Sequence, residues 1–296
     1  MDIKNELKKY QNIVEKELEK YLRKEDCPEK ILNESMEYSL MAGGKRLRPV
    51  LVIASYELFK KDFEKCFPFA VAIEMLHNFS LIHDDLPAID NDDIRHGKPT
   101  NHKKFNEHTA ILAGDGLLNY AYLVISEDLK NIKDINEMRN KLLAFNELAF
   151  ATDRVIAGEY VDTEYEGKPI SSDYLEYMHK NKTGAFLRAC VRIGAILGEA
   201  TDEELGNLTI YAEKIGIAFQ IKDDILSEEG DEKITGKPVG NDRKRKKCTY
   251  ISKYGLEKSK EILENIIKEA IQAIEILGEK GEFLKALAIY IKDRNK

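Results

Sequence analysis

Apolar side chains recur at intervals of three and four residues along most of the chain, the spacing that places them on one face of a helix. The pattern predicts an amphipathic helix over residues 3–22, with a charged outer face, and another over residues 30–42. Gly43 and Gly44 follow the second helix, and glycine readily adopts the left-handed conformation in which helices end. Pro49 suits the first turn of a further helix.

Other segments are apolar on every side, which predicts helices buried in the middle of a bundle. These segments are residues 67–85, 185–197 and 208–226, whereas residues 255–277 return to the amphipathic pattern. No series of alternating strands joined by hairpin turns is found. The polar stretches between helices are too short to be tethers between domains. We therefore expect residues 1–296 to form a single all-α domain.

The composition is that of a globular chain with a sizeable core, since 43% of the residues are hydrophobic. Lys and Arg total 46 against 53 Asp and Glu, and the resulting charge of −7 argues against a nucleic-acid partner. The first residues lack the uncharged stretch of a signal peptide, and no apolar run reaches the roughly 20 residues of a membrane-spanning helix. The four cysteines lack a CxxC pair and are expected to be free thiols. We expect a cytoplasmic protein without a membrane span.

Carboxylates gather directly after the buried helix predicted for residues 67–85. Five lie within ten residues, namely Asp84, Asp85, Asp90, Asp92 and Asp93. Like charges at the end of a buried helix are costly unless a cation compensates them, and carboxylate oxygens favour Mg²⁺ or Ca²⁺. A solvated acidic loop is the alternative. A calcium loop of the EF-hand type is excluded, because Ile94 and Arg95 stand where a ligand and a glycine are needed.

A second acidic site falls within the helix predicted for residues 208–226. Helical spacing places four polar side chains on one face, namely Gln220, Asp223, Asp224 and Ser227. An isolated pair of aspartates is most often a surface feature, so this pair gains its weight from being the second such site. Two acidic sites in one small α-domain can converge on a single metal cluster from opposite walls.

Basic residues form a complementary set. The segment Gly43–Pro49 carries Lys45, Arg46 and Arg48 at a helix junction, which suits a phosphate, although an ordinary basic helix cap has the same features. Further cations are Arg95, Lys182, Lys237 and the basic run 243–247. These parts together predict a diphosphate held by Mg²⁺ between two carboxylate walls, at the mouth of an apolar cavity. The residues alone lead to ionisation of an allylic diphosphate and leave the acceptor open.

The motifs resemble, in kind and in order, those of the trans-isoprenyl diphosphate synthases of the polyprenyl synthetase family, most of all the short-chain bacterial type. The resemblance covers about residues 30–296 and rests on Gly44-Lys45-Arg46-Leu47-Arg48-Pro49, His77, Asp84-Asp85 to Asp90, Lys182-Thr183-Gly184, Phe219-Gln220 with Asp223-Asp224, and Gly236-Lys237. It implies the isoprenoid synthase fold, an all-α bundle around a deep central cavity, and a homodimer.

The resemblance also implies roles for individual residues. Mg²⁺, or Mn²⁺ in its place, would be bound by Asp84, Asp85, Asp90 and Asp223, with Asp224 in support. The allylic diphosphate would contact Arg95, Lys182, Thr183, Gln220 and Lys237, with Lys247 closing from the C-terminal side. Isopentenyl diphosphate would contact Lys45, Arg48 and His77, with Gly44 allowing its close approach and His96 in the place of a second arginine.

The implied reaction joins isopentenyl diphosphate to dimethylallyl and geranyl diphosphates and gives farnesyl diphosphate. Phe79, five positions before Asp84 and next to Ser80, would form the floor of the hydrocarbon tunnel and stop further elongation. The two-residue insertion Pro87-Ala88 is also similar to the bacterial farnesyl type. Because an aromatic ring here could equally be a plain core residue, geranylgeranyl diphosphate remains an alternative product.

Two departures from the family pattern leave a further alternative open. His96 stands where an arginine is usual, and Ser227 stands where the second acidic motif normally ends in aspartate. These changes would suit a catalytically impaired subunit of a heteromeric prenyl synthase. A phosphohydrolase of the HD type, suggested by His83-Asp84, would not explain the second acidic site. A terpene cyclase would not need Lys45 and its basic neighbours.

Overall fold

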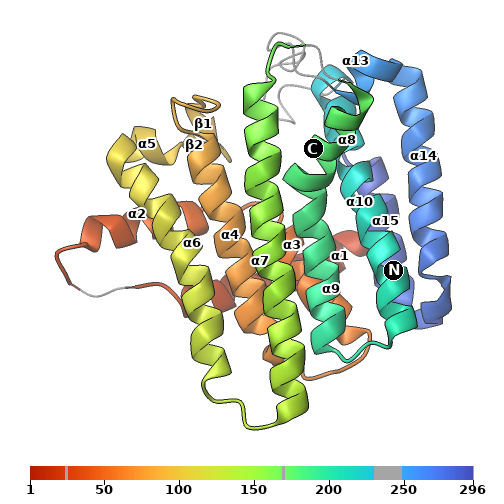
Figure 1. Ribbon diagram of the computed structural model, residues 1–296, viewed down its shortest axis with the longest axis horizontal. Coiled ribbons are helices and arrows are strands. Elements are labelled where there is room, and N and C mark those ends of the chain that lie inside the picture. Colours follow the sequence, from red (N-terminus) through yellow and green to blue (C-terminus); the bar gives the residue numbers. More distant parts are fainter. Residues whose placement is uncertain (24–25, 169–170, 230–248, 296) are drawn as a thin grey trace.

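The computed structural model describes residues 1–23, 26–168, 171–229 and 249–295, most of which lie in helices (Figure 1). The helices are α1 (Ile3–Glu19), α2 (Lys30–Leu40), α3 (Leu47–Glu57), α4 (Phe67–Asp84), α5 (Asn101–Lys104), α6 (Glu107–Leu129), α7 (Ile135–Glu164), α8 (Ser172–His179), α9 (Ala185–Leu197), α10 (Asp202–Glu229), α13 (Tyr250–Tyr254), α14 (Leu256–Ala273) and α15 (Glu282–Asp293). Short 3₁₀ turns lie at Phe63–Cys66 and Glu275–Gly281. The all-α fold expected from the sequence is confirmed.

Helix α4 is a central helix of the bundle because its sequence leaves no polar face for solvent. Phe69, Ile73 and Leu76 are completely buried, and the helix packs against α3 and α6. Helix α9 packs in turn against α3, α7 and α10 (Figure 1). The buried helices predicted over 67–85 and 185–197 are therefore confirmed. These central helices carry the acidic and basic motifs at their ends.

Some helix bounds differ from the sequence-based expectation for identifiable local reasons. Helix α10 begins at Asp202 rather than at residue 208, because Thr201 and Glu204 cap its first turn by reciprocal hydrogen bonds. The helix predicted over 255–277 ends at Ala273, and the 3₁₀ turn that follows contains Gly278 with φ of 55°. Capping chemistry, which apolar spacing does not report, sets the start of α10.

The only strands in the described part of the chain form a short hairpin that the apolar pattern did not predict. Strands β1 (Ile94–Arg95) and β2 (Lys98–Pro99) pair antiparallel. His96 and Gly97, the two residues of the turn, have φ of 51° and 75°. Positive φ at both central positions matches the right-handed twist of paired strands, so the hairpin closes tightly. It projects Arg95 toward the end of α4.

Helix α6 bears on the expectation that no segment spans a membrane. Of the helices within the described ranges, it is the one long and apolar enough to do so by length and composition. Its most apolar stretch is 44% buried, and α6 packs along α4. Because core helices often have such a composition, this is weak evidence for a span. The expected absence of a membrane span stays a prediction.

Candidate active site

Arg95 is carried to the end of α4 by the β1–β2 hairpin, where its guanidinium holds the Asp85 carboxylate. Its Nε lies 2.8 Å from both Asp85 oxygens, and its Nη2 lies 2.5 Å from Oδ1. The Asp85 side chain is buried, which raises its pKa, and Arg95 opposes that shift. The sequence assigned these two residues to metal and substrate, and the structure brings them together as partners.

Asp84 lies in a region crowded with negative charge. The backbone N–H of Asp90 donates to the Asp84 carbonyl oxygen at 2.8 Å, which folds the intervening loop back over the helix end. Burial, with the nearby Glu159 and Asp90 carboxylates, raises the pKa of Asp84 to about 8, although Lys182 lowers it. A cation bound beside Asp84 would stabilise the ionised form of this carboxyl group, which its surroundings disfavour.

Lys182 brings positive charge to this region. Two carboxylates that the sequence analysis missed hold its ammonium group in place. Its Nζ lies 2.7 Å from Glu159 Oε2 and 2.5 Å from Asp162 Oδ2, both on α7. Burial lowers the pKa of Lys182, but Asp162, Glu159 and Asp84 outweigh it, so the pKa is raised and the ammonium stays charged. The sequence did contain a signal for Glu159 and Asp162. They are two acids three residues apart, on one face of a long helix and next to Gly158.

The backbone around Lys182 differs from the expected helix start. Lys180–Gly184 form a π-helical turn between α8 and α9, a form of helix that is frequent at functional sites. Glycines on both sides make room for it. A Cβ on Gly158 of α7 would lie 2.4 Å from the Lys182 nitrogen, and a Cβ on Gly216 of α10 would lie 2.8 Å from the Gly184 Cα. Neighbouring helices thus touch this turn backbone to backbone.

The second acidic site lies on α10, and its side chains already have protein partners. Thr183 Oγ1 donates to Gln220 Oε1 at 3.1 Å, and Gln220 Nε2 donates to Asp224 Oδ1 at 3.1 Å. The other oxygen of Asp224 accepts the backbone N–H of Tyr250 at 2.8 Å. Asp223 is paired with Arg294 Nη2 at 2.6 Å. Asp224 is therefore buried and hydrogen-bonded, and its supporting role at a metal site stays a prediction. Arg294 is a neighbour of this site that the sequence motifs did not indicate.

The donor set fits a hard divalent cation. Both walls offer carboxylate oxygens, the ligands that Mg²⁺ and Mn²⁺ prefer, and the raised pKa of Asp84 indicates that Lys182 and Arg95 offset the effects of burial and negative charge only in part. Within the described ranges, however, no group of three or more His, Cys, Asp or Glu side chains is arranged to hold a metal ion. The convergence of the two walls on one metal cluster stays a prediction.

The basic junction before α3 presents two cations, where the sequence suggested three. Gly43 and Gly44 have φ of 94° and 110°, a winding that favours glycine. Arg48 Nη1 lies 3.0 Å from His77 Nε2, so these two predicted ligands are adjacent. The Arg46 side chain is only 1% exposed and turns into the core. Arg46 is therefore not available to a phosphate.

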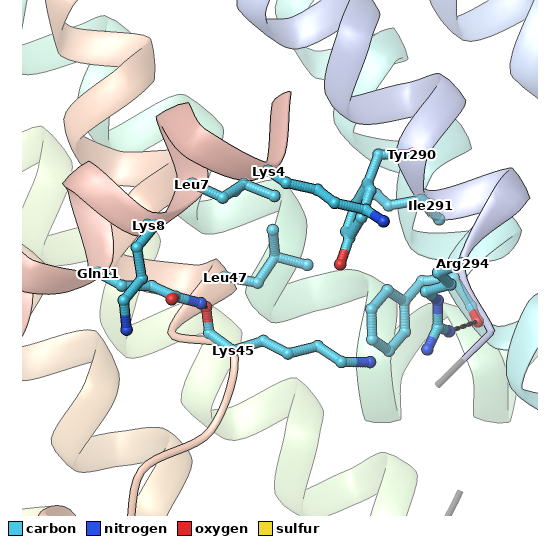
Figure 2. Close-up of a pocket in the computed structure, with 10 residues that line it drawn as sticks. Lys4, Leu7, Lys8, Gln11, Lys45, Leu47, Tyr290, Ile291 and Arg294 are labelled. Carbon is cyan, nitrogen blue, oxygen red and sulfur yellow. Dashed lines mark hydrogen bonds between the residues drawn. The ribbon is translucent and has the colours of Figure 1, made fainter. Parts of the chain in front are cut away.

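A pocket of about 160 Å³ lies beside this junction, between α1 and α15 (Figure 2). Lys45 and Arg294 both approach it and lie over the Phe219 ring, at 5.8 and 4.1 Å from its centroid. Lys4 and Lys8 of α1 line the same pocket. The C-terminal helix thus joins the N-terminal helix beside the basic junction.

The remaining predicted residues have various placements. Phe79 is 5% exposed and meets the His83 ring edge-on at 5.8 Å, and Ser80 donates its hydroxyl to the His77 carbonyl. His96 lies against Gly44, since a Cβ on that glycine would lie 3.4 Å from its Nε2. Lys237 and Lys247 fall outside the described residues.

The chain is similar to known proteins over nearly its whole length. The model of the family described as Polyprenyl synthetase matches residues 29–280. A Bacillus subtilis (strain 168) protein named farnesyl diphosphate synthase is 43% identical over 284 residues, 95% of each chain, and a Cyanophora paradoxa geranylgeranyl diphosphate synthase is 43% identical over 88% of this chain and 87% of its own. The crystal structure of an FPP/GFPP synthase from Zymomonas mobilis, 33% identical, aligns over 98% of this chain and 99% of that one with a TM-score of 0.86. The chain belongs to the polyprenyl synthetase family.

Proposed function

We propose that the protein is a prenyltransferase that condenses isopentenyl diphosphate with dimethylallyl and geranyl diphosphates to give farnesyl diphosphate. One observation carries the proposal: the Lys182-Thr183 turn interacts with both acidic sites. The charge of Lys182 interacts with that of Asp84 in the first site, and Thr183 is hydrogen-bonded to Gln220 of the second. A diphosphate placed at this turn would be within reach of both walls. The names of the Bacillus subtilis and Cyanophora paradoxa relatives support the reaction class.

The proposed reaction begins when the allylic C–O bond breaks and its electron pair leaves with the diphosphate oxygen. The isopentenyl double bond then attacks the allylic carbocation, a C–C bond forms, and a proton passes to the released diphosphate. Mg²⁺ or Mn²⁺, when bound, would stabilise the charge of the leaving diphosphate. The residues proposed to hold it are Asp84, Asp85, Asp90 and Asp223.

The chain's own cations would orient the two substrates. Lys182 and Arg95, with Thr183 and Gln220, are proposed to bind the allylic diphosphate, and Lys237 and Lys247 remain part of this proposal. Lys45 and Arg48 are proposed to bind isopentenyl diphosphate. Burial, followed by the Arg48 charge, holds the pKa of His77 well below its usual range. His77 would therefore act as a neutral hydrogen-bond partner.

Turnover of the purified protein tests the proposal. With Mg²⁺, isopentenyl diphosphate and geranyl diphosphate, we expect diphosphate release and farnesyl diphosphate as the main product on chromatography, both lost on adding EDTA. A protein that releases no diphosphate would instead support the impaired-subunit alternative. Geranylgeranyl diphosphate as the main product would uphold prenyl transfer and overturn the role of Phe79 as a tunnel floor.

The homodimer is also a proposal. Large apolar side chains stay exposed along α6 and α7, among them Leu112, Leu123, Leu142 and Phe150, each 40 to 54% exposed. Exposed apolar surface of this extent on neighbouring helices is typical of an interface. A second copy of the chain is the occupant we propose, since it would bury both helices.

A further inference from the structure

Arg46 stands between the two cations assigned to isopentenyl diphosphate, yet its side chain turns away from them. Its backbone has φ of 50° and ψ of 29°, the left-handed conformation that is unfavourable for a residue with a Cβ. Strain of this kind persists only where surrounding contacts hold it. The contacts of the Arg46 side chain must therefore stabilise this backbone conformation.

One guanidinium ties three helices to the junction at which α3 begins. Its Nε donates to Glu15 Oε1 of α1 at 2.8 Å, and its Nη1 donates to Glu74 Oε1 of α4 at 2.6 Å. Its Nη2 donates to the carbonyl of Leu40, the last residue of α2, at 2.7 Å. Glu74 is itself 4% exposed, so this ion pair is shielded from water.

The junction and helix α4 are joined a second time by the predicted substrate ligands Arg48 and His77. Arg48 follows Arg46 by two residues, and His77 follows Glu74 by three, close to one turn of α4. The Arg46–Glu74 pair in the core and the Arg48–His77 contact at 3.0 Å thus run side by side. Any shift of the first bridge would move the second.

We propose that Arg46 is a positioning residue for isopentenyl diphosphate. Its buried pair with Glu74 fixes the junction against α4 and so holds its chain neighbours Lys45 and Arg48 in place. Arg46 touches no substrate and acts through its neighbours. The inference rests on the proposed function, because it takes Lys45 and Arg48 as diphosphate ligands.

The test is binding of isopentenyl diphosphate alone, measured by isothermal titration calorimetry, because this probe needs no turnover. Arg46→Met by itself leaves Glu74 buried without its partner and can unfold the chain. The decisive variant is therefore R46M/E74M, which removes both charges. We expect its Kd for isopentenyl diphosphate to rise about ten-fold and its Kd for geranyl diphosphate to change by less than about two-fold.

A matched control separates positioning from general stability. Arg192 of α9 is also held by side-chain hydrogen bonds, to Glu147 at 2.8 Å and to Thr209 at 2.6 Å. We expect Arg192→Met to leave both dissociation constants unchanged. Arg46→Lys keeps the charge but loses the several donors of the guanidinium, so we expect its Kd for isopentenyl diphosphate to lie between those of the wild type and R46M/E74M.

Two results would overturn the inference while leaving the proposed function intact. One is an unchanged affinity of R46M/E74M for isopentenyl diphosphate. The other is an equal loss of affinity for both diphosphates, which would indicate a general structural role. A wild-type protein that binds no isopentenyl diphosphate would instead overturn the ligand assignment of Lys45 and Arg48 and, with it, the inference.

Discussion

At the scale of single residues, His96 stands where the resemblance to the family leads us to expect an arginine. Its φ of 51° closes the hairpin next to Gly44, and Arg46 shows that this chain also holds an arginine at φ of 50°. Burial, followed by the Arg95 charge, lowers the pKa of His96, which favours the neutral imidazole. His96→Arg would add a permanent charge and a bidentate fork.

We therefore expect His96→Arg to lower the KM for isopentenyl diphosphate about five-fold, since one charge-assisted contact is gained. Steady-state kinetics with geranyl diphosphate held at saturation would measure it. An unchanged KM would contradict the idea that the imidazole weakens this clamp.

Phe79 lends itself to a test of product length. We expect Phe79→Leu to give products longer than farnesyl diphosphate, because a smaller side chain would lower the proposed tunnel floor. Product chromatography would measure the change. Phe69→Leu is the matched control, since Phe69 is completely buried on the same helix and its loss should cost stability only, about 1 kcal/mol. Unaltered products from both variants would show that Phe79 is an ordinary core residue.

His179 predicts a loss of stability in acid. Its ring is 4% exposed and stacks on Tyr250 at 5.3 Å, and burial lowers its pKa to about 4. The unfolded chain therefore binds a proton near pH 6.5, and the folded chain binds it only near pH 4. The neutral His179 ring therefore contributes fully to the stability of the fold above pH 6.5. This contribution, about 3 kcal/mol at most, is lost as the pH falls toward 4.

His179→Phe keeps the stacked ring and removes the titrating group. We expect the free energy of unfolding in urea to fall less between pH 7 and pH 5 in this variant than in the wild type. Equal falls in the two proteins would show that other groups cause the acid sensitivity.

At the scale of elements, the approach of α7 to the π turn depends on one absent side chain. Gly158→Ala would place a Cβ 2.4 Å from the Lys182 nitrogen, so the turn or the helix must shift. We expect kcat to fall more than about ten-fold, because a small displacement of a charged ligand is costly. Steady-state kinetics and thermal unfolding would measure both effects.

Gly206→Ala is the control for Gly158→Ala. Gly206 lies in α10 with open space around it, so alanine should stabilise the helix by about 0.5–1 kcal/mol and leave kcat unchanged. A Gly158→Ala protein with wild-type kcat would show that the turn can shift without harm.

The elements that the sequence predicted well are those set by short-range spacing. The helices α4 and α9 follow from apolar residues within a few turns, and the same pattern predicts the position of Asp84 and Asp85 at the end of α4. The β1–β2 hairpin was missed because His96 and Gly97 signal a turn only through their positive φ. Residue spacing records no backbone angle.

Contacts between distant segments account for what the sequence could not predict in the site. The pairs of Lys182 with Glu159 and of Asp223 with Arg294 join residues 23 and 71 positions apart. Only the packing of whole helices brings such residues together. The same limit explains Arg46, whose buried partners lie on α1 and α4, and which the sequence alone presented as a third phosphate ligand.

At the scale of the whole molecule, the apolar side chains of α6 and α7 predict association of two copies. Phe150→Glu would place a charge on a side chain that is 54% exposed in the single chain. We expect this variant to sediment as a monomer in analytical ultracentrifugation and the wild type to sediment as a dimer. Ile289→Glu, on α15 and 45% exposed, should leave the dimer unchanged. A monomeric wild type would contradict the proposal.

The pairing of Lys182 with Glu159 and Asp162 also bears on whether the chain needs a metal ion in order to fold. An ammonium group already lies where the first acidic site is most crowded, so the described fold contains its own counter-ion there. Structural zinc sites, by contrast, leave their domains unfolded without metal. We therefore expect the chain to fold in the presence of EDTA, and the proposed metal to be a component of turnover and not of the scaffold.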